Sequence, residues 1–279
     1  MNGTINDFSF GMITPVTAYA VACVGAALGL RCVARTVHHA QGWRPGWLAL
    51  GSASLGCGIW TMHFIAMVGF RVEETSINYD LGLTVLSLAL AITVVGIGVF
   101  IVGYAGASRM SLSTAGTLAG LGVAAMHYVG MDAMHLNGEI RYDTRIVALS
   151  VVVAIVAATV ALWATVSIRG FLSSLAASLV MGIAVTGMHY TGMAAVSVHL
   201  RSGVDPTPVG HAPTSLLLPM LIVPCIFLVL ATVVVMFDPL LVLGEGEWKA
   251  TSVGPTDTPL PAWSSTPQKH DRSQSTSAS

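Results

Sequence analysis

Long apolar stretches alternate with short polar connections along most of the chain. The hydrocarbon core of a bilayer is about 30 Å thick and needs roughly 20 apolar residues per helix. Seven stretches are long enough, and they cover residues 11–34, 47–69, 81–104, 112–135, 146–168, 172–198 and 215–237. The pattern predicts an all-α membrane protein with seven transmembrane helices.

The composition agrees with a multi-span membrane protein. Of the 279 residues, 54% are hydrophobic and 9% are charged, whereas soluble domains carry about 25% charged residues. The net charge of −1 shows no nucleic-acid footprint. No phosphate-binding glycine loop and no zinc-protease motif appears. The cysteines all lie in apolar runs and are expected to be unpaired small hydrophobes: Cys23, Cys32, Cys57 and Cys225.

The chain divides into a membrane domain and a polar tail. Residues 1–243 hold the apolar stretches, and residues 244–279 are rich in Ser, Thr and Pro, so we expect a disordered tail. Eight Lys and Arg residues fall on the side of the tail and four on the other side, or five against four without the tail. Because cytoplasmic loops are enriched in Lys and Arg, the N-terminus is predicted outside and the tail in the cytoplasm.

A short motif occurs three times, in the second, fourth and sixth stretches. Residues 62–67 read Met-His-Phe-Ile-Ala-Met, residues 126–131 read Met-His-Tyr-Val-Gly-Met, and residues 188–193 read Met-His-Tyr-Thr-Gly-Met. The placement predicts a two-helix unit used three times, with a seventh helix added. At about 1.5 Å per residue, the histidines lie at one level in the outer part of the membrane: His63, His127 and His189.

The spacing of the motif predicts a metal site. Each histidine shares a helix face with the methionine four residues later, in the pairs His63/Met67, His127/Met131 and His189/Met193. A glycine seven residues before each histidine is expected to let the three faces converge: Gly56, Gly120 and Gly182. Imidazole binds several transition metals and thioether sulfur selects copper, especially Cu(I), so copper is predicted before zinc. The first methionines either flank the site or pack in the core: Met62, Met126 and Met188.

A packing role is the alternative for any single copy. A histidine in an apolar helix is often a hydrogen-bonded core residue, and methionine often fills gaps. Ionisable residues inside a membrane are functional candidates, and three copies at equal depth favour that interpretation. Phe64, Tyr128 and Tyr190 are interpreted as interfacial anchors.

At these residues the sequence resembles the MHYT domain, a bacterial integral-membrane sensor module. Met188-His-Tyr-Thr191 spells the motif, while Phe64 replaces the tyrosine of the first copy. The resemblance covers about residues 11–240. It implies a sensor in the bacterial plasma membrane that binds copper through the motif His and Met residues. It also implies a response to a diatomic gas (oxygen, carbon monoxide or nitric oxide) or to redox state.

Many relatives of this family carry a cyclic-di-GMP enzyme, a kinase or a DNA-binding output domain. None is recognisable here, so the sequence predicts a non-catalytic sensor that acts on an unknown cytoplasmic signalling partner. A transporter or channel for copper or another small cation is the second hypothesis. A haem protein that uses two of the histidines is the third, but it leaves the methionines unexplained.

Overall fold

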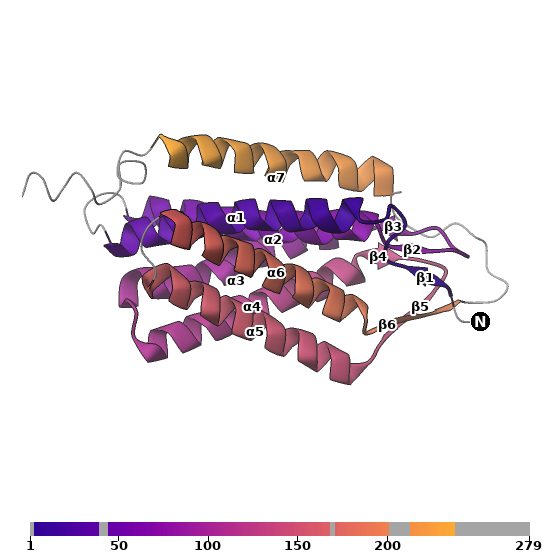
Figure 1. Cartoon of the computed structure of the whole chain (residues 1–279). Coiled ribbons are helices and arrows are strands. Elements are labelled where there is room, and N and C mark those ends of the chain that lie inside the picture. Colours follow the sequence, from indigo (N-terminus) through magenta and orange to yellow (C-terminus); the bar gives the residue numbers. More distant parts are fainter. Residues whose placement is uncertain (1–2, 39–43, 168–170, 201–212, 238–279) are drawn as a thin grey trace, which may run out of the picture. The chain divides into compact units, whose positions relative to one another are not determined.

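The computed structural model describes residues 3–38, 44–167, 171–200 and 213–237. Within these ranges the chain forms seven long helices (Figure 1). They are α1 (Ile13–His38), α2 (Arg44–Val68), α3 (Leu81–Ala105), α4 (Arg109–Asp132), α5 (Thr144–Ser167), α6 (Phe171–Met193) and α7 (Pro213–Met236). The predicted tail, residues 244–279, lies outside the described residues.

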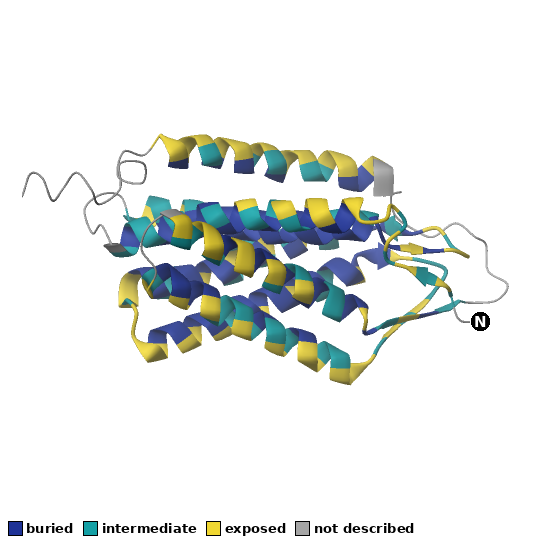
Figure 2. Ribbon diagram, viewed as in Figure 1, coloured by how far each residue is buried: buried dark blue, intermediate teal, exposed yellow. Residues whose placement is uncertain are grey.

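Six of these helices are long and apolar enough to cross a membrane, and α4 is the one that falls short. The first half of α4 is rich in small polar residues and glycine, which lower its hydropathy. Exposed residues lie along the outer sides of several helices (Figure 2). Many of them are large and apolar, for example Val152 and Val156 on α5 and Val223 and Val229 on α7. A helix that exposes so much apolar surface belongs in lipid rather than in water.

Helices α1 to α6 pack in a closed ring of neighbours. Each helix without the motif lies between two motif helices: α1 packs on α6 and α2, α3 on α2 and α4, and α5 on α4 and α6. Helix α7 packs on α2 and α1. The motif helices therefore alternate with the others around the ring, an arrangement in which their inward faces can meet.

Short antiparallel strand pairs join the beginning and the end of each helix pair. Before and after α1–α2, β1 (Ile5–Asn6) pairs with β2 (Arg71–Val72). In the next two units, β3 (Asn78–Tyr79) pairs with β4 (Met134–His135), and β5 (Gly138–Tyr142) with β6 (Val196–Leu200). The predicted repeat of two helices is thus a strand–helix–motif helix–strand unit. We call the end of the helices that carries these strands the strand end (Figure 1).

The strands correct two predicted helix boundaries. The predicted stretches 112–135 and 172–198 are too long, because α4 ends at Asp132 and α6 at Met193. Residues 134–135 and 196–200 are strands instead. In β6 the alternation of Val196, Ser197 and Val198 suits a strand, and its register with β5 pairs Val198 with Ile140.

Candidate metal centre

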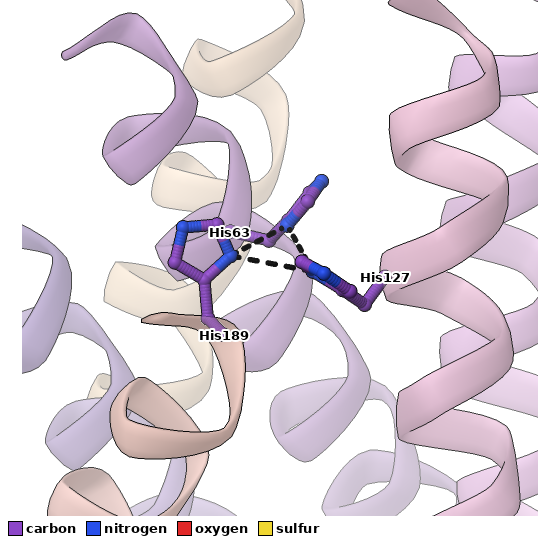
Figure 3. A group of neighbouring side chains, drawn as sticks. All are labelled: His63, His127 and His189. Carbon is purple, nitrogen blue, oxygen red and sulfur yellow. Dashed lines mark hydrogen bonds between the residues drawn. The ribbon is translucent and has the colours of Figure 1, made fainter. Parts of the chain in front are cut away.

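The three motif histidines meet inside the helix ring. His63, His127 and His189 come from α2, α4 and α6, and each is exposed by 1% or less. Their Nδ1 atoms form a triangle with sides of 3.1 Å (His63–His189), 3.2 Å (His127–His63) and 3.3 Å (His189–His127). Figure 3 shows one ring from each helix, with one nitrogen of each ring at the centre of the group. Side chains more than 60 residues apart in sequence thus form one cluster.

Hydrogen bonds between the three imidazoles cannot give every Nδ1 atom of this cluster a partner. The rings stand nearly perpendicular to one another, at 84°, 80° and 87°. A neutral imidazole has one N–H and one acceptor nitrogen, so three Nδ1 atoms in mutual contact cannot all be paired with one another. The Nε2 atoms of His63 and His127 are also buried without a hydrogen-bond partner. A cation at the centre would give all three Nδ1 atoms a partner.

The triangle has the dimensions of a metal site. A point at its centre lies about 1.85 Å from each nitrogen, which is the side divided by the square root of three, whereas zinc–imidazole bonds are about 2.0–2.1 Å long. Each nitrogen would move by only about 0.2 Å to reach that bond length. Among the residues that the structure describes, no carboxylate or thiol joins the three histidines in a metal-binding group. The donor set therefore fits an imidazole-binding metal such as copper or zinc.

All six motif methionines are buried. Met62, Met126, Met131 and Met188 are fully buried, and Met67 and Met193 are at least 96% buried. No solvated or lipid-facing role is left for any of them. Their role as sulfur ligands stays a prediction. Asp132, the residue after Met131, is exposed and is not a member of the histidine group.

The predicted role of three glycines is wrong. Gly56, Gly120 and Gly182 do not lie between the motif helices but against the neighbouring helices, at Ile92 of α3, Ile155 of α5 and Cys23 of α1. Two other glycines lie at the cluster: Gly130 contacts His63 and Gly192 contacts His127. They occupy the small fifth position of the motif. The sequence shows that this small residue is repeated, but it does not show that the residue contacts the histidine of another motif helix.

Aromatic rings extend from each histidine towards the strand end. His63, His127 and His189 make edge contacts with the next residue in the chain, Phe64, Tyr128 or Tyr190. Each of these rings contacts a second aromatic ring outside the motif helices: Tyr79, Tyr142 or Phe8 respectively. Burial raises the pKa of Tyr79, and it raises the pKa of Tyr142 to about 12. Phe64 is fully buried, so its interpretation as an interfacial anchor is wrong.

A cavity at the strand end reaches the first motif. It has a volume of about 710 Å³ and is lined by the N-terminal segment and by the residues that follow α2, with Met67 among them. Its charged lining residues are Arg71 and Glu73. The cavity, whose lining mixes polar and apolar side chains, therefore extends from the strand end as far as a motif methionine.

Comparison with known proteins places the chain in a family. The sequence profile of the MHYT family, described as a bacterial signalling protein N-terminal repeat, matches residues 56–115, 120–178 and 182–244. The chain therefore belongs to the MHYT family of bacterial membrane signalling proteins, and the resemblance seen in the motifs is confirmed. Each matched segment begins at one of the glycines Gly56, Gly120 and Gly182.

Three signalling proteins are similar to parts of the chain. MucR of Pseudomonas aeruginosa, a bifunctional diguanylate cyclase/cyclic di-GMP phosphodiesterase, is 36% identical over 56% of this chain. The cyclic di-GMP phosphodiesterase NbdA of the same organism is 36% identical over 67% of the chain, and the signaling protein YkoW of Bacillus subtilis is 29% identical over 55%. The matches cover only 23%, 24% and 20% of these relatives. No solved structure matches the chain.

Proposed function

We propose that this protein is a copper-binding sensor of the bacterial membrane, with one copper ion held by Nδ1 of His63, His127 and His189. The observation that carries the proposal is the triangle of three buried Nδ1 atoms with sides of 3.1–3.3 Å. Copper in such a site would supply one-electron redox chemistry and affinity for a diatomic gas: oxygen, carbon monoxide or nitric oxide. The sensed signal is therefore such a gas or the redox state.

Thioether sulfur supports copper over zinc. Six buried methionines belong to the motif copies that supply the histidines. Thioether sulfur stabilises Cu(I), whereas the usual ligands of zinc are thiolate, imidazole and carboxylate. Met67, Met131 and Met193 are the proposed sulfur donors, since each shares a helix face with its histidine. Met62, Met126 and Met188 are the second candidates.

The protein residues do three things in this proposal. The helix ring keeps bulk water from the histidines, which are buried in the described chain. The three imidazoles come from three separate helices, so a change in their preferred spacing would move α2, α4 and α6 relative to one another. We place the strand end outside and the opposite end in the cytoplasm, where Arg109 at the start of α4 would face a signalling partner. Relatives whose names include cyclic di-GMP enzymes support a signalling role.

The test is the metal content and the optical spectrum of the purified protein and its single His→Ala variants. We expect one copper per chain and no Soret band of haem. A three-imidazole site loses its geometry when one ligand leaves, so His63→Ala, His127→Ala and His189→Ala should each abolish or sharply weaken binding. If each variant kept two thirds of the metal, the three motifs would be separate sites and the proposal would be wrong. Uptake of copper into vesicles would instead favour the transporter hypothesis.

A further inference from the structure

A small cavity lies between α4, α5 and α6, next to the histidine cluster. It is lined by alanines of α5 (Ala154, Ala157 and Ala158), by Val123 of α4, and by Val185 and Met188 of α6. Val123 and Val185 are four residues before His127 and His189, so the cavity is one helical turn from these histidines. Met188 precedes His189 directly.

The chemistry of this cavity selects its occupant. The space open to the centre of a water-sized sphere is about 20 Å³, more than the roughly 10–15 Å³ needed by one molecule of that size. All of its lining residues are Ala, Val or Met. A buried water needs two to four polar partners, and apolar cavities without them stay dry and bind apolar atoms such as xenon. The occupant that fits is therefore one small apolar molecule.

The helix ring has two equivalent interfaces, one between α2, α3 and α4 and one between α6, α1 and α2. Neither has two alanines at the positions of Ala157 and Ala184. Gly56 packs on Ile92 in the same way as its counterpart Gly120 packs on Ile155. Ile92 of α3 is therefore equivalent to Ile155 of α5, and the two helices can be aligned residue by residue. Ala157 and Ala158 of α5 then correspond to Val94 and Val95 of α3. A methyl group added at Gly122, the counterpart of Ala184 of α6, would stand 2.7 Å from Cβ of Val94. The valines thus occupy, between α2, α3 and α4, the place that alanines leave open.

The third copy is closed in another way. Gly25 of α1 lies against Gly58 of α2, with only 2.6 Å between a Cβ built on Gly25 and Cα of Gly58. Two helix backbones that approach so closely leave no room between them. At the interface of α4, α5 and α6 the corresponding pair is Ala157 and Ala184. Their methyl groups keep the helix backbones apart but do not fill the space between them.

The cavity has a side that faces lipid. Ala157 and Ala158 are half-buried, and the neighbouring Val156 and Val160 of α5 are exposed. Apolar gases dissolve better in hydrocarbon than in water. A molecule that enters beside Ala157 comes within one helical turn of the histidines without crossing the polar strand end.

We propose that the cavity between α4, α5 and α6 binds one diatomic gas molecule of dioxygen size, which enters from the lipid and lies one helical turn from the histidine cluster. The inference rests on the proposed function for its purpose, the supply of gas to the histidines, but the cavity itself needs no metal.

Xenon is the probe that tests this site in the full chain, by xenon NMR or by diffraction under xenon pressure, with and without copper. We expect xenon between α4, α5 and α6 in both forms. The double variant Ala157→Val/Ala158→Val carries the residues of the first copy. It should lower xenon occupancy by at least about tenfold, because two bulkier side chains fill a cavity of this size. Ala148→Val, at an exposed position of α5, is the control and should bind xenon as before.

The opposite substitution, from valine to alanine in α3, keeps the test valid if the Ala157→Val/Ala158→Val variant does not fold. Val94→Ala/Val95→Ala should create a second xenon site between α2, α3 and α4. Absence of xenon from the α4–α5–α6 interface, or full occupancy in the Ala157→Val/Ala158→Val variant, would overturn the inference. Xenon binding in a protein that takes up no copper would refute the proposed function and leave the cavity site standing.

Discussion

Gly130 of α4 lies directly against the imidazole of His63 on α2. A methyl group added at Gly130 would stand 2.6 Å from Nε2 of His63, and one added at Gly192 would stand 2.4 Å from Nε2 of His127. Real Cβ atoms do not come so close to another atom. The small fifth residue of a motif therefore gives room to the histidine of the preceding copy. In the first copy this residue is Ala66, which is also buried.

The first prediction follows from this contact. Gly130→Ala and Gly192→Ala should each displace one histidine ring and weaken metal binding by about 10–100-fold, the usual effect of disturbing the residues that orient metal ligands. The measurement is a metal titration of each purified variant. Gly187→Ala is the matched control on α6, because nothing lies within 4 Å of its added methyl group.

The control should keep the affinity of the wild-type protein. It should also stabilise α6 slightly, since alanine is favoured over glycine in a helix by about 1 kcal/mol. If Gly130→Ala bound metal as tightly as Gly187→Ala, the contact with His63 would have no role in shaping the site.

The second prediction concerns Asp7 in the N-terminal segment. Its Oδ1 atom is buried without a hydrogen-bond partner, and burial raises the pKa of this carboxyl above its ordinary value of 3.8. The folded protein then holds a proton that the unfolded chain has lost, so stability falls as the pH rises from 3.8 through the raised pKa. Asp7→Asn should remove this loss. Melting temperatures of both proteins between pH 4 and about 7 would show it.

Glu74 provides a comparison of opposite sign. Hydrogen bonds from the side chain and backbone of Thr4 lower the pKa of Glu74 below 4.5. Its contribution to stability is present above pH 4.5 and is lost as the pH falls through the lowered pKa. Glu74→Gln should therefore destabilise the protein at neutral pH and have no effect in acid. For Asp7, the contradicting result is a melting temperature that depends on pH in the same way in Asp7→Asn and in the wild-type protein. It would show that the Asp7 carboxyl stays solvated.

The helices could be predicted because each carries its own signal. Apolar stretches such as 81–104 and 146–168 match α3 and α5 within two residues at each end. The three histidines could also be connected, because the same motif at the same depth on three parallel helices leaves few arrangements other than a shared centre. In both cases the information lies within one helix or in a motif that the sequence repeats.

The strand pairs and the glycine contacts could not be predicted in the same way. Strands of two residues, such as β1 and β2, have no periodicity of their own, and they form only because the helix ends are brought together. The direction in which Gly56 faces depends on how the ring packs. Residues seven apart share a helix face only approximately, and each motif helix of the ring packs on a neighbour at either side.

The third prediction concerns the stacked pair Phe8 and Tyr190. The ring centroids are 5.6 Å apart with an interplanar angle of 19°, and Tyr190 in turn contacts the ring of His189. Ser9 holds the same segment to the residue that follows α2, since its N–H and its hydroxyl both donate to the carbonyl of Gly69. Phe8→Ala should loosen the segment. Because a stacked pair contributes about 0.5–1.5 kcal/mol, we expect metal release to a chelator to accelerate by about two- to tenfold.

Phe10→Ala is the control for this experiment. Phe10 belongs to the same segment and is similarly exposed, but its ring lies under the guanidinium of Arg71, 4.9 Å away, rather than on Tyr190. Amide hydrogen exchange of residues 4–10 would report the loosening directly. Equal release rates in the two variants would mean that Phe8 does not hold the segment over the site.

The last prediction separates sulfur ligation from packing. Leucine is close to methionine in volume and usually costs less than about 1.5 kcal/mol as its replacement. The triple variant Met67→Leu, Met131→Leu and Met193→Leu should therefore keep the fold. Because thioether sulfur stabilises Cu(I) over Cu(II), the variant should bind Cu(I) more weakly and its copper potential should shift downward. The measurements are competition with a Cu(I) chelator and redox titration.

A second triple variant provides the comparison: Met62→Leu, Met126→Leu and Met188→Leu change the other buried methionine of each motif. Whichever triple lowers the Cu(I) affinity identifies the methionines that supply sulfur. Oxidation to sulfoxide removes the softness of the donor, so mild peroxide treatment should weaken Cu(I) binding in the wild-type protein and leave the sensitive triple variant unchanged. Unchanged Cu(I) affinity in both triples would make all six methionines core residues and leave three imidazoles alone, a donor set for which zinc is the better assignment.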